Sequence, residues 1–89
     1  MKNCFYSQLF KKDFKKARKL PIEDLKLIFD TIAKLERGED LPYRLKDHPL
    51  KGNWLGHREC HLKPDLLLIY VENDNEIHSM RLGSHSELF

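Results

Sequence analysis

Histidines, acids and an arginine are concentrated in three short segments of the second half of this chain: Lys46-Asp47-His48-Pro49-Leu50, Arg58-Glu59-Cys60-His61 and the closing Arg81 to Phe89. These residue types suit acid–base cleavage of RNA by its own 2′-hydroxyl. That reaction needs a base for the hydroxyl proton, positive charge for the crowded phosphorane and an acid for the departing 5′-oxygen. Histidine serves both proton transfers, because its unperturbed pKa of about 6.5 leaves both protonation states available near neutrality. Such chemistry requires neither metal nor cofactor, and we expect none.

Each candidate has an expected role. We expect His85 to be the general acid, Arg81 to clamp the phosphate, and His61 or Asp65 to be the general base or its orienting partner. His48 would position the phosphate or share in proton transfer. Two of these residues also have a purely structural interpretation. Asp65 follows a proline in a tight turn, and Arg81 could be an ordinary exposed strand residue.

The first helix predicted from the sequence carries a concentrated positive charge. Between Lys2 and Lys19 there are seven basic residues and one acid, although the whole chain has a net charge of only +2. Clustered Lys and Arg either form a solvated face or bind phosphates by releasing counterions from nucleic acid. The basic face consists of Lys11, Lys12, Lys15, Lys16, Arg18 and Lys19.

Two helices are predicted in the first half of the chain. Residues 7–20 follow a helical period with Ser7 as the N-cap, and their apolar side is made of Leu9, Phe10, Phe14, Ala17 and Leu20. Residues 21–37 form the second helix, with Pro21 in its first turn and Gly38 after its end. We expect an antiparallel helical hairpin.

A loop and several strands complete the expected elements. Residues 38–57 lack periodicity but contain large apolar side chains, which indicates an ordered functional loop. Strands are predicted at about 58–62, 66–71 and 76–82, and a short strand near 3–6 precedes the helices. The fold class is therefore α+β, with a C-terminal antiparallel sheet packed on the helices.

The two turns, 63–65 and 73–75, set the register of the sheet. If both are three-residue loops, one face is apolar and suits covering by the helices; it carries Cys60, Leu62, Leu66, Leu68, Tyr70, Met80 and Leu82. The other face then holds Glu59, His61, Leu67, Ile69, Ser79 and Arg81. This register would bring the charged candidates to a single surface.

Composition limits the class of protein. Residues 1–89 are enough for one domain, and with 34% charged and 40% hydrophobic residues the chain is typical of a soluble globular protein, which we expect in the cytoplasm. Two cysteines, Cys4 and Cys60, suggest buried thiols rather than a disulfide framework. No CxxC or HxxxH spacing indicates zinc.

Several separated motifs, in order, resemble the YafQ branch of the RelE/ParE toxin superfamily. They are the run from Lys46 to Trp54, the run Arg58-Glu59-Cys60-His61-Leu62-Lys63-Pro64-Asp65, the segment Leu68-Ile69-Tyr70 and the closing Arg81 to Phe89. The resemblance implies a RelE-like fold and a bacterial type II toxin that cleaves mRNA in the ribosomal A site. It also implies silencing by a DinJ- or RelB-like antitoxin, with a free monomer that becomes a hetero-oligomer in the complex.

The resemblance places the family's active-site positions on His48, Glu59, His61, Asp65, Arg81, His85 and Phe89. Glu59 departs from the usual aspartate by one methylene, and Leu66 stands where a tryptophan is often found. Lys51 and Phe89 complete the expected RNA-binding set, although Phe89 could equally pack the tail as stack on a base.

Two other functions remain open. A ParE-like toxin of the same superfamily would inhibit DNA gyrase without cutting RNA, and it would not need this set of histidines. A ribosome-independent ribonuclease would cut free RNA.

Overall fold

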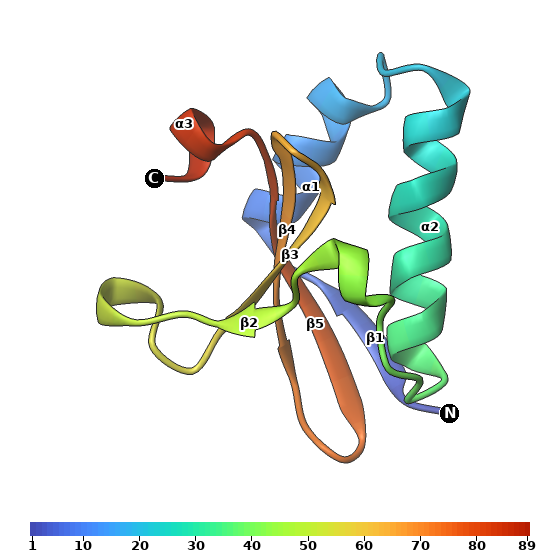
Figure 1. The fold of residues 1–89 in the computed structure, drawn as a ribbon, viewed down its shortest axis with the longest axis vertical. Helices are drawn as coiled ribbons and strands as arrows, with labels where there is room; N and C mark the ends of the chain where they lie inside the picture. Colours follow the sequence, from blue (N-terminus) through green and yellow to red (C-terminus); the bar gives the residue numbers. More distant parts are fainter.

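A computed structural model describes residues 1–89. Figure 1 shows the elements in chain order: β1 (Asn3–Tyr6), α1 (Gln8–Ala17), α2 (Ile22–Glu36), β2 (His48–Pro49), β3 (Arg58–Lys63), β4 (Leu66–Glu72), β5 (Glu76–Gly83) and α3 (His85–Leu88). The strands form one sheet in the order β1-β5-β4-β3-β2. Only the β1–β5 pair is parallel. The predicted α+β class, with an N-terminal strand, two helices and a C-terminal antiparallel sheet, is confirmed.

The two long helices begin where the sequence predicts. The Ser7 hydroxyl accepts a hydrogen bond from the backbone N–H of Phe10 at 2.9 Å, as an N-cap should, and it donates to the carbonyl of Met80 at 2.7 Å. In Figure 1, α1 and α2 run in opposite directions, which confirms the helical hairpin. α1 lies along β5, and α2 contacts both β3 and β5.

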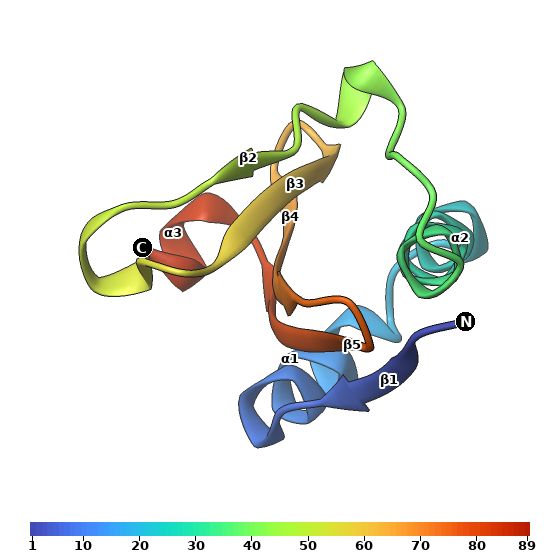
Figure 2. The ribbon, with the colours of Figure 1, turned by 90° about the horizontal axis from the view of Figure 1, so that it is seen from below.

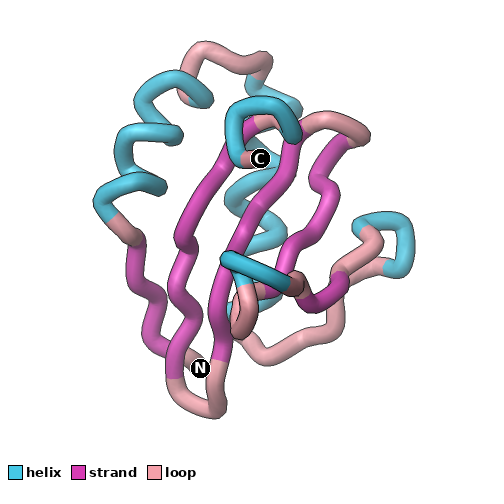
Figure 3. Tube along the Cα trace, turned by 90° about the vertical axis from the view of Figure 1, so that its left-hand side faces the viewer, coloured by secondary structure: helices cyan, strands magenta, loops and turns pink.

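The sheet separates two apolar clusters. The main core lies on the α2 side and combines Phe10 and Ala17 of α1, Ile28, Ile32 and Leu35 of α2, and Cys60, Leu62, Leu68, Tyr70, Ile77 and Leu82 of the sheet, with Leu45. A smaller cluster on the opposite face comprises Leu50, Trp54, Leu67, Ile69, Met80 and Leu88, and we call it the apolar strip. Figures 2 and 3 show α3 on this face, across the sheet from α2.

The register between β3 and β4 is the predicted one over most of its length. His61 pairs with Leu67, and Cys60 pairs with Leu68. At the tip, however, Lys63 pairs with Leu66 after a one-residue shift. The turn is therefore tighter than the three residues 63–65 that we expected.

The register between β4 and β5 corrects the predicted faces. Glu72 pairs with Ile77, one residue later than expected, so Ser79 lies opposite Tyr70 on the core side. A β-bulge at Met80 then adds a second one-residue shift, so Arg81 pairs with Ile69, two residues later than expected, and returns to the predicted face. Met80 was predicted in the core but packs in the apolar strip, and Ser79 was predicted on that face but is buried opposite it.

The predicted loop 38–57 is ordered, but it is not a plain loop. It contains two short 3₁₀ helices, η1 (Tyr43–Leu45) and η2 (Gly52–Trp54), and between them the two-residue strand β2. β2 was missed because it includes a proline, which lacks an N–H and is tolerated only at a sheet edge. This edge strand places His48 beside β3.

Two further expectations concern membranes and thiols. None of the helices is long and apolar enough to cross a membrane. Cys60 is buried as expected, and burial raises the pKa of its thiol to about 12. Cys4 is only half-buried, because β1 is an edge strand.

Candidate functional site

Three of the predicted site residues meet at the β2–β3 edge of the sheet. One carboxylate oxygen of Glu59, Oε1, lies 3.1 Å from Nε2 of His48 and 3.2 Å from Nε2 of His61. The Glu59 side chain is only 5% exposed, whereas the two imidazoles reach solvent. The other ring nitrogen of His48, Nδ1, lies 3.1 Å from the carbonyl oxygen of Pro49. We call these three residues the His–Glu–His cluster.

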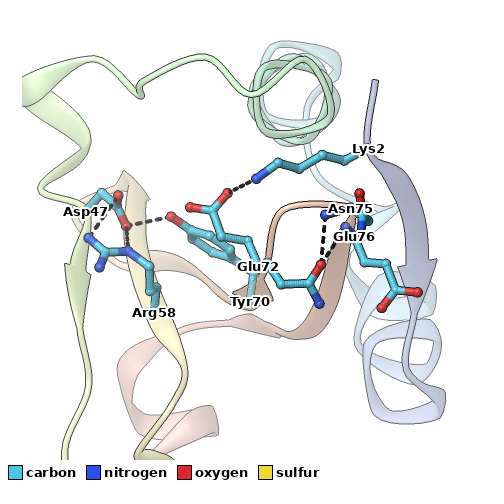
Figure 4. Close-up of polar contacts among 8 residues, drawn as sticks. Lys2, Asp47, Arg58, Tyr70, Glu72, Asn75 and Glu76 are labelled. Carbon is cyan, nitrogen blue, oxygen red and sulfur yellow. Dashed lines mark hydrogen bonds and ion pairs between the residues drawn. The ribbon is translucent and has the colours of Figure 1, made fainter.

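Asp47, next to His48, anchors this segment to the sheet. Its carboxylate accepts a 2.7 Å hydrogen bond from the Tyr70 hydroxyl and two hydrogen bonds from the Arg58 guanidinium, as Figure 4 shows. The hydrogen bonds to Asp47 raise the pKa of Arg58. Burial and the same carboxylate raise the pKa of Tyr70. Arg58 therefore remains a cation and Tyr70 keeps its hydroxyl proton, so both continue to donate to Asp47.

A second pair of candidates meets at the C-terminal end of β5. Oδ1 of Asp65, in the β3–β4 turn, accepts a 2.8 Å hydrogen bond from the backbone N–H of His85. Ser84 and Glu87 form a reciprocal capping box at the start of α3, so His85 occupies the first position of a capped helix. The imidazole of His85 itself is exposed.

Arg81 lies on the predicted face, but its guanidinium turns toward α1. Nε and Nη2 donate to Asp13 at 2.8 and 3.2 Å, and Asp13 also accepts the backbone N–H of Leu82 at 2.9 Å. The hydrogen bond to Asp13 raises the pKa of Arg81, so the side chain remains a cation. Nη1 has no protein partner and is free to donate to a ligand.

The register places these residues in rows across the sheet. His48, Glu59, Ile69 and Arg81 pair in sequence across β2, β3, β4 and β5, while His61 pairs with Leu67, which pairs with Gly83. With strands about 4.8 Å apart, Glu59 and Arg81 are separated by roughly 10 Å at their Cα atoms. The predicted residues therefore form two groups, the His–Glu–His cluster and the Arg81 and His85 side, with the apolar strip between them.

Phe89 belongs to an aromatic group that the sequence did not indicate. Its ring centroid lies 5.0 Å from that of His85 and 6.3 Å from that of Trp54, which in turn meets His57 edge-on. Phe89 is 52% exposed, so its ring packs against His85 and Trp54 and also faces solvent. Lys51 is exposed and lies at the N-cap of η2, the short helix that ends at Trp54.

The basic face is exposed along its whole length. None of its six residues forms an ion pair, although the structure contains several pairs elsewhere. Its positive charge is therefore not neutralised by the protein.

Three site-forming residues were missed by sequence reasoning: Asp13, Asp47 and Trp54. Asp13 carried a usable signal, as the single acid among the cations of the first helix. Asp47 lies in the first of the polar segments, but nothing indicated its anchoring role, because its partners Arg58 and Tyr70 are eleven and twenty-three residues away. Trp54 was noted as apolar, but nothing local indicated its contact with Phe89.

The sequence of this chain is similar to that of a known protein family over nearly its whole length. The family described as "Bacterial toxin of type II toxin-antitoxin system, YafQ" matches residues 2–89. The "mRNA interferase toxin YafQ" of Escherichia coli K12 is 38% identical over 84 residues, which cover 94% of this chain and 91% of that protein.

Solved structures agree with this match. A metal-bound toxin from Helicobacter pylori superposes with a TM-score of 0.88 at 44% identity, covering 100% of both chains. YafQ in the E. coli DinJ–YafQ complex superposes with a TM-score of 0.83 at 35% identity, covering 100% of this chain and 99% of that one. With the family match spanning nearly the whole chain, this protein belongs to the YafQ family of bacterial type II toxin-antitoxin toxins.

Proposed function

We propose that this YafQ-family toxin is an endoribonuclease that cleaves mRNA in the ribosomal A site by metal-independent attack of the RNA's own 2′-hydroxyl. The observation that carries the proposal is the division of the ionisable side chains into two groups on one face of the sheet, with the apolar strip between them. Base and acid must act from opposite sides of an in-line displacement, which suits groups facing each other across a gap. The relative named mRNA interferase supports the same activity.

The His–Glu–His cluster supplies the base. Nε2 of His61 lies 3.2 Å from Oε1 of Glu59, and a neutral His61 with its proton on Nε2 keeps the Nδ1 lone pair, which can take the proton of the 2′-hydroxyl. The freed oxygen attacks phosphorus, and the Glu59 carboxylate stabilises the imidazolium that forms. Asp65 was the alternative base, but its hydrogen bond to the backbone of His85 favours a positioning role.

The opposite side supplies the acid and the phosphate clamp. His85 donates a proton to the departing 5′-oxygen as the P–O bond breaks, leaving a 2′,3′-cyclic phosphate and a 5′-hydroxyl. Arg81 neutralises charge on the phosphorane through its free Nη1. Phe89 and Lys51 hold the flanking nucleotides by stacking and by charge.

The basic face of α1 supplies the contact with ribosomal RNA. Its six unpaired cations gain affinity by displacing counterions from phosphates. The partner that silences the toxin is a DinJ-like antitoxin, as in the E. coli DinJ–YafQ complex. We expect the antitoxin to be acidic where it meets the basic face, and the free toxin to be a cytoplasmic monomer.

The experiment that tests this function compares the parent protein with His85→Ala on programmed ribosomes and on naked RNA. We expect cleavage only on ribosomes, undiminished by EDTA, and abolished in His85→Ala while circular dichroism stays unchanged. His57→Ala, which removes a histidine outside both groups, should cleave like the parent. Cutting of naked RNA would indicate a ribosome-independent ribonuclease, and growth arrest with intact mRNA and supercoiling defects would indicate a gyrase inhibitor.

A further inference from the structure

A pocket of about 430 Å³ opens at one end of the sheet, and we call it the hairpin-tip pocket. It lies where the C-terminal half of α1, the tip of the β3–β4 hairpin and the start of α3 meet, near the top of Figure 1. Its apolar floor is buried or half-buried and consists of Ala17, Leu20, Leu66 and Leu82. Its rim carries polar side chains, among them Lys16, Asp65, Ser84 and Glu87. A hollow of this size, with an apolar floor and a few polar groups, is the usual form of a small-ligand site.

Hydrogen bonds fix the walls of the hairpin-tip pocket. The Lys63 ammonium donates to both carboxylate oxygens of Asp24 at 3.1 and 3.2 Å, which ties the end of β3 to α2. The hydrogen bond from the backbone N–H of His85 to Asp65 ties the hairpin tip to α3. The capping box of α3 holds the third wall. The pocket is therefore preformed, and binding a ligand would cost little ordering of the protein.

The hairpin-tip pocket lies on the leaving-group side of the proposed reaction. The row of paired residues that starts at His61 passes through Leu67 and ends at Gly83, which lines the pocket. In an in-line displacement the attacking and leaving oxygens lie on opposite sides of the phosphorus atom. With His61 as the base and His85 as the acid, the nucleotide that carries the departing 5′-oxygen continues beyond His85, toward the pocket.

The polar groups of the rim distinguish between bases. Asp65 accepts a hydrogen bond through Oδ1, and its Oδ2 has no partner within the protein. A carboxylate only accepts hydrogen bonds, so it favours the exocyclic amino group of adenine or cytosine. Uracil carries a carbonyl at that position, which a carboxylate repels. The Lys16 ammonium forms no ion pair and suits the phosphate that follows the base.

We propose that the hairpin-tip pocket binds the base of the nucleotide on the 3′ side of the cut, and that it prefers adenine or cytosine to uracil. The aliphatic floor contacts the face of the base, the Asp65 carboxylate accepts the amino group, and Lys16 contacts the following phosphate. A base held here keeps the departing 5′-oxygen beside His85. The selectivity of cleavage rests on the proposed function, whereas the binding of a free nucleotide does not.

Binding is tested by NMR titration of the free protein with the 3′-monophosphates of adenosine, cytidine and uridine. These probes carry the 5′-hydroxyl and the 3′-phosphate of the leaving nucleotide. We expect the backbone amide signals of Leu66 and Gly83 to shift, and the adenosine and cytidine probes to bind roughly tenfold more tightly than the uridine probe. Signals that do not shift at the pocket, or equal affinities for the three probes, would overturn the proposal.

Filling the pocket provides a second test of binding. Leu20→Trp places an indole on the floor and should abolish binding of the adenosine probe. Leu9→Trp is the matched control, because it makes the same exchange at an exposed position of α1 outside the pocket and should bind like the parent. Circular dichroism checks that both variants are folded. Equal affinities in the two variants would contradict the assignment of the pocket.

Selectivity is measured as single-turnover cleavage on programmed ribosomes of three mRNAs that differ only in the nucleotide after the cut. The parent should cut the adenine and cytosine mRNAs roughly tenfold faster than the uracil mRNA. Asp65→Asn keeps an acceptor for the N–H of His85 and replaces the second oxygen by an amide donor. This variant should therefore cut the uracil mRNA about as fast as the adenine mRNA, whereas a purely structural role of Asp65 would change all three rates in the same proportion.

Three further outcomes are decisive. Equal rates for the three mRNAs in the parent would overturn the selectivity. Loss of binding to a DinJ-like antitoxin in Leu20→Trp, with nucleotide binding unchanged, would make the pocket a protein-docking site and overturn the proposal. Selective nucleotide binding without cleavage of any mRNA would overturn the proposed function while leaving the binding site intact.

Discussion

The Asp65 carboxylate accepts a 2.8 Å hydrogen bond from the backbone N–H of His85, although the two residues are twenty positions apart in the chain. This contact ties the tip of the β3–β4 hairpin to the first residue of α3. We therefore expect Asp65 to hold the proposed general acid in position and not to take part in proton transfer.

We expect Asp65→Ala to lower the cleavage rate about tenfold to a hundredfold, because His85 loses its backbone anchor. Asp65→Asn keeps an acceptor oxygen and should recover most of the rate. The measurement is single-turnover cleavage on programmed ribosomes across pH 5.5 to 8.5, where the shape of the profile should not change. If Asp65 were the base, Asn would be as inactive as Ala.

We expect Asp13→Ala to lower the free energy of unfolding by about 2–4 kcal/mol, because it leaves the Arg81 guanidinium and the Leu82 N–H without their partner. Both side chains of the ion pair are largely buried, at 21% and 15% exposed, so solvent screens it little. Urea denaturation followed by Trp54 fluorescence measures the change. Asp30→Ala, an exposed acid of α2 without a hydrogen bond, should stay within about 0.5 kcal/mol; an equal loss in both variants would contradict the role of Asp13.

We expect the double variant Lys12→Gln/Lys15→Gln to bind ribosomes more weakly and with less dependence on salt. Each phosphate contact contributes about 0.7–0.9 to the slope of log K against log salt, so the slope should fall by about 1.5. Lys26→Gln/Arg44→Gln removes two exposed charges outside the basic face and serves as the control. A slope that both variants lower equally would mean that net charge, and not this face, matters.

We expect the stability of the protein to depend on pH through Glu87. Hydrogen bonds from the Ser84 backbone and hydroxyl lower the pKa of Glu87 below its ordinary value. A lowered folded-state pKa gives stability that is present above the unfolded value, about 4.3, and is lost as pH falls through the folded value. Glu87→Gln keeps an acceptor for the capping box but does not titrate.

Urea denaturation between pH 6 and 3 tests this expectation. The parent should lose more stability on acidification than Glu87→Gln does. Asp74→Asn, in the exposed β4–β5 turn and without a hydrogen bond, should retain the steeper dependence of the parent. Identical pH dependences for the parent and Glu87→Gln would rule out the contribution of Glu87.

The amino-acid sequence alone determined the elements and most of the sheet. Helical and strand periods are local properties, so α1, α2, β1 and β3 to β5 were predicted close to their observed limits. The sequence also predicted correctly that Leu82 lies on the core face of the sheet. Leu82 is apolar and its neighbour Arg81 is charged, so the favoured arrangement buries Leu82 and keeps the guanidinium out of the core.

The tertiary structure alone decided how the site is assembled. The late pairing of Glu72 and the bulge at Met80 together shift the register by two residues, so Arg81 reaches the expected face by a register that no local pattern indicates. β2 is only two residues long, yet its pairing brings His48 to Glu59. Asp13 holds Arg81 across 68 positions. Such contacts depend on which distant segments are neighbours, and chain periodicity carries no information about that.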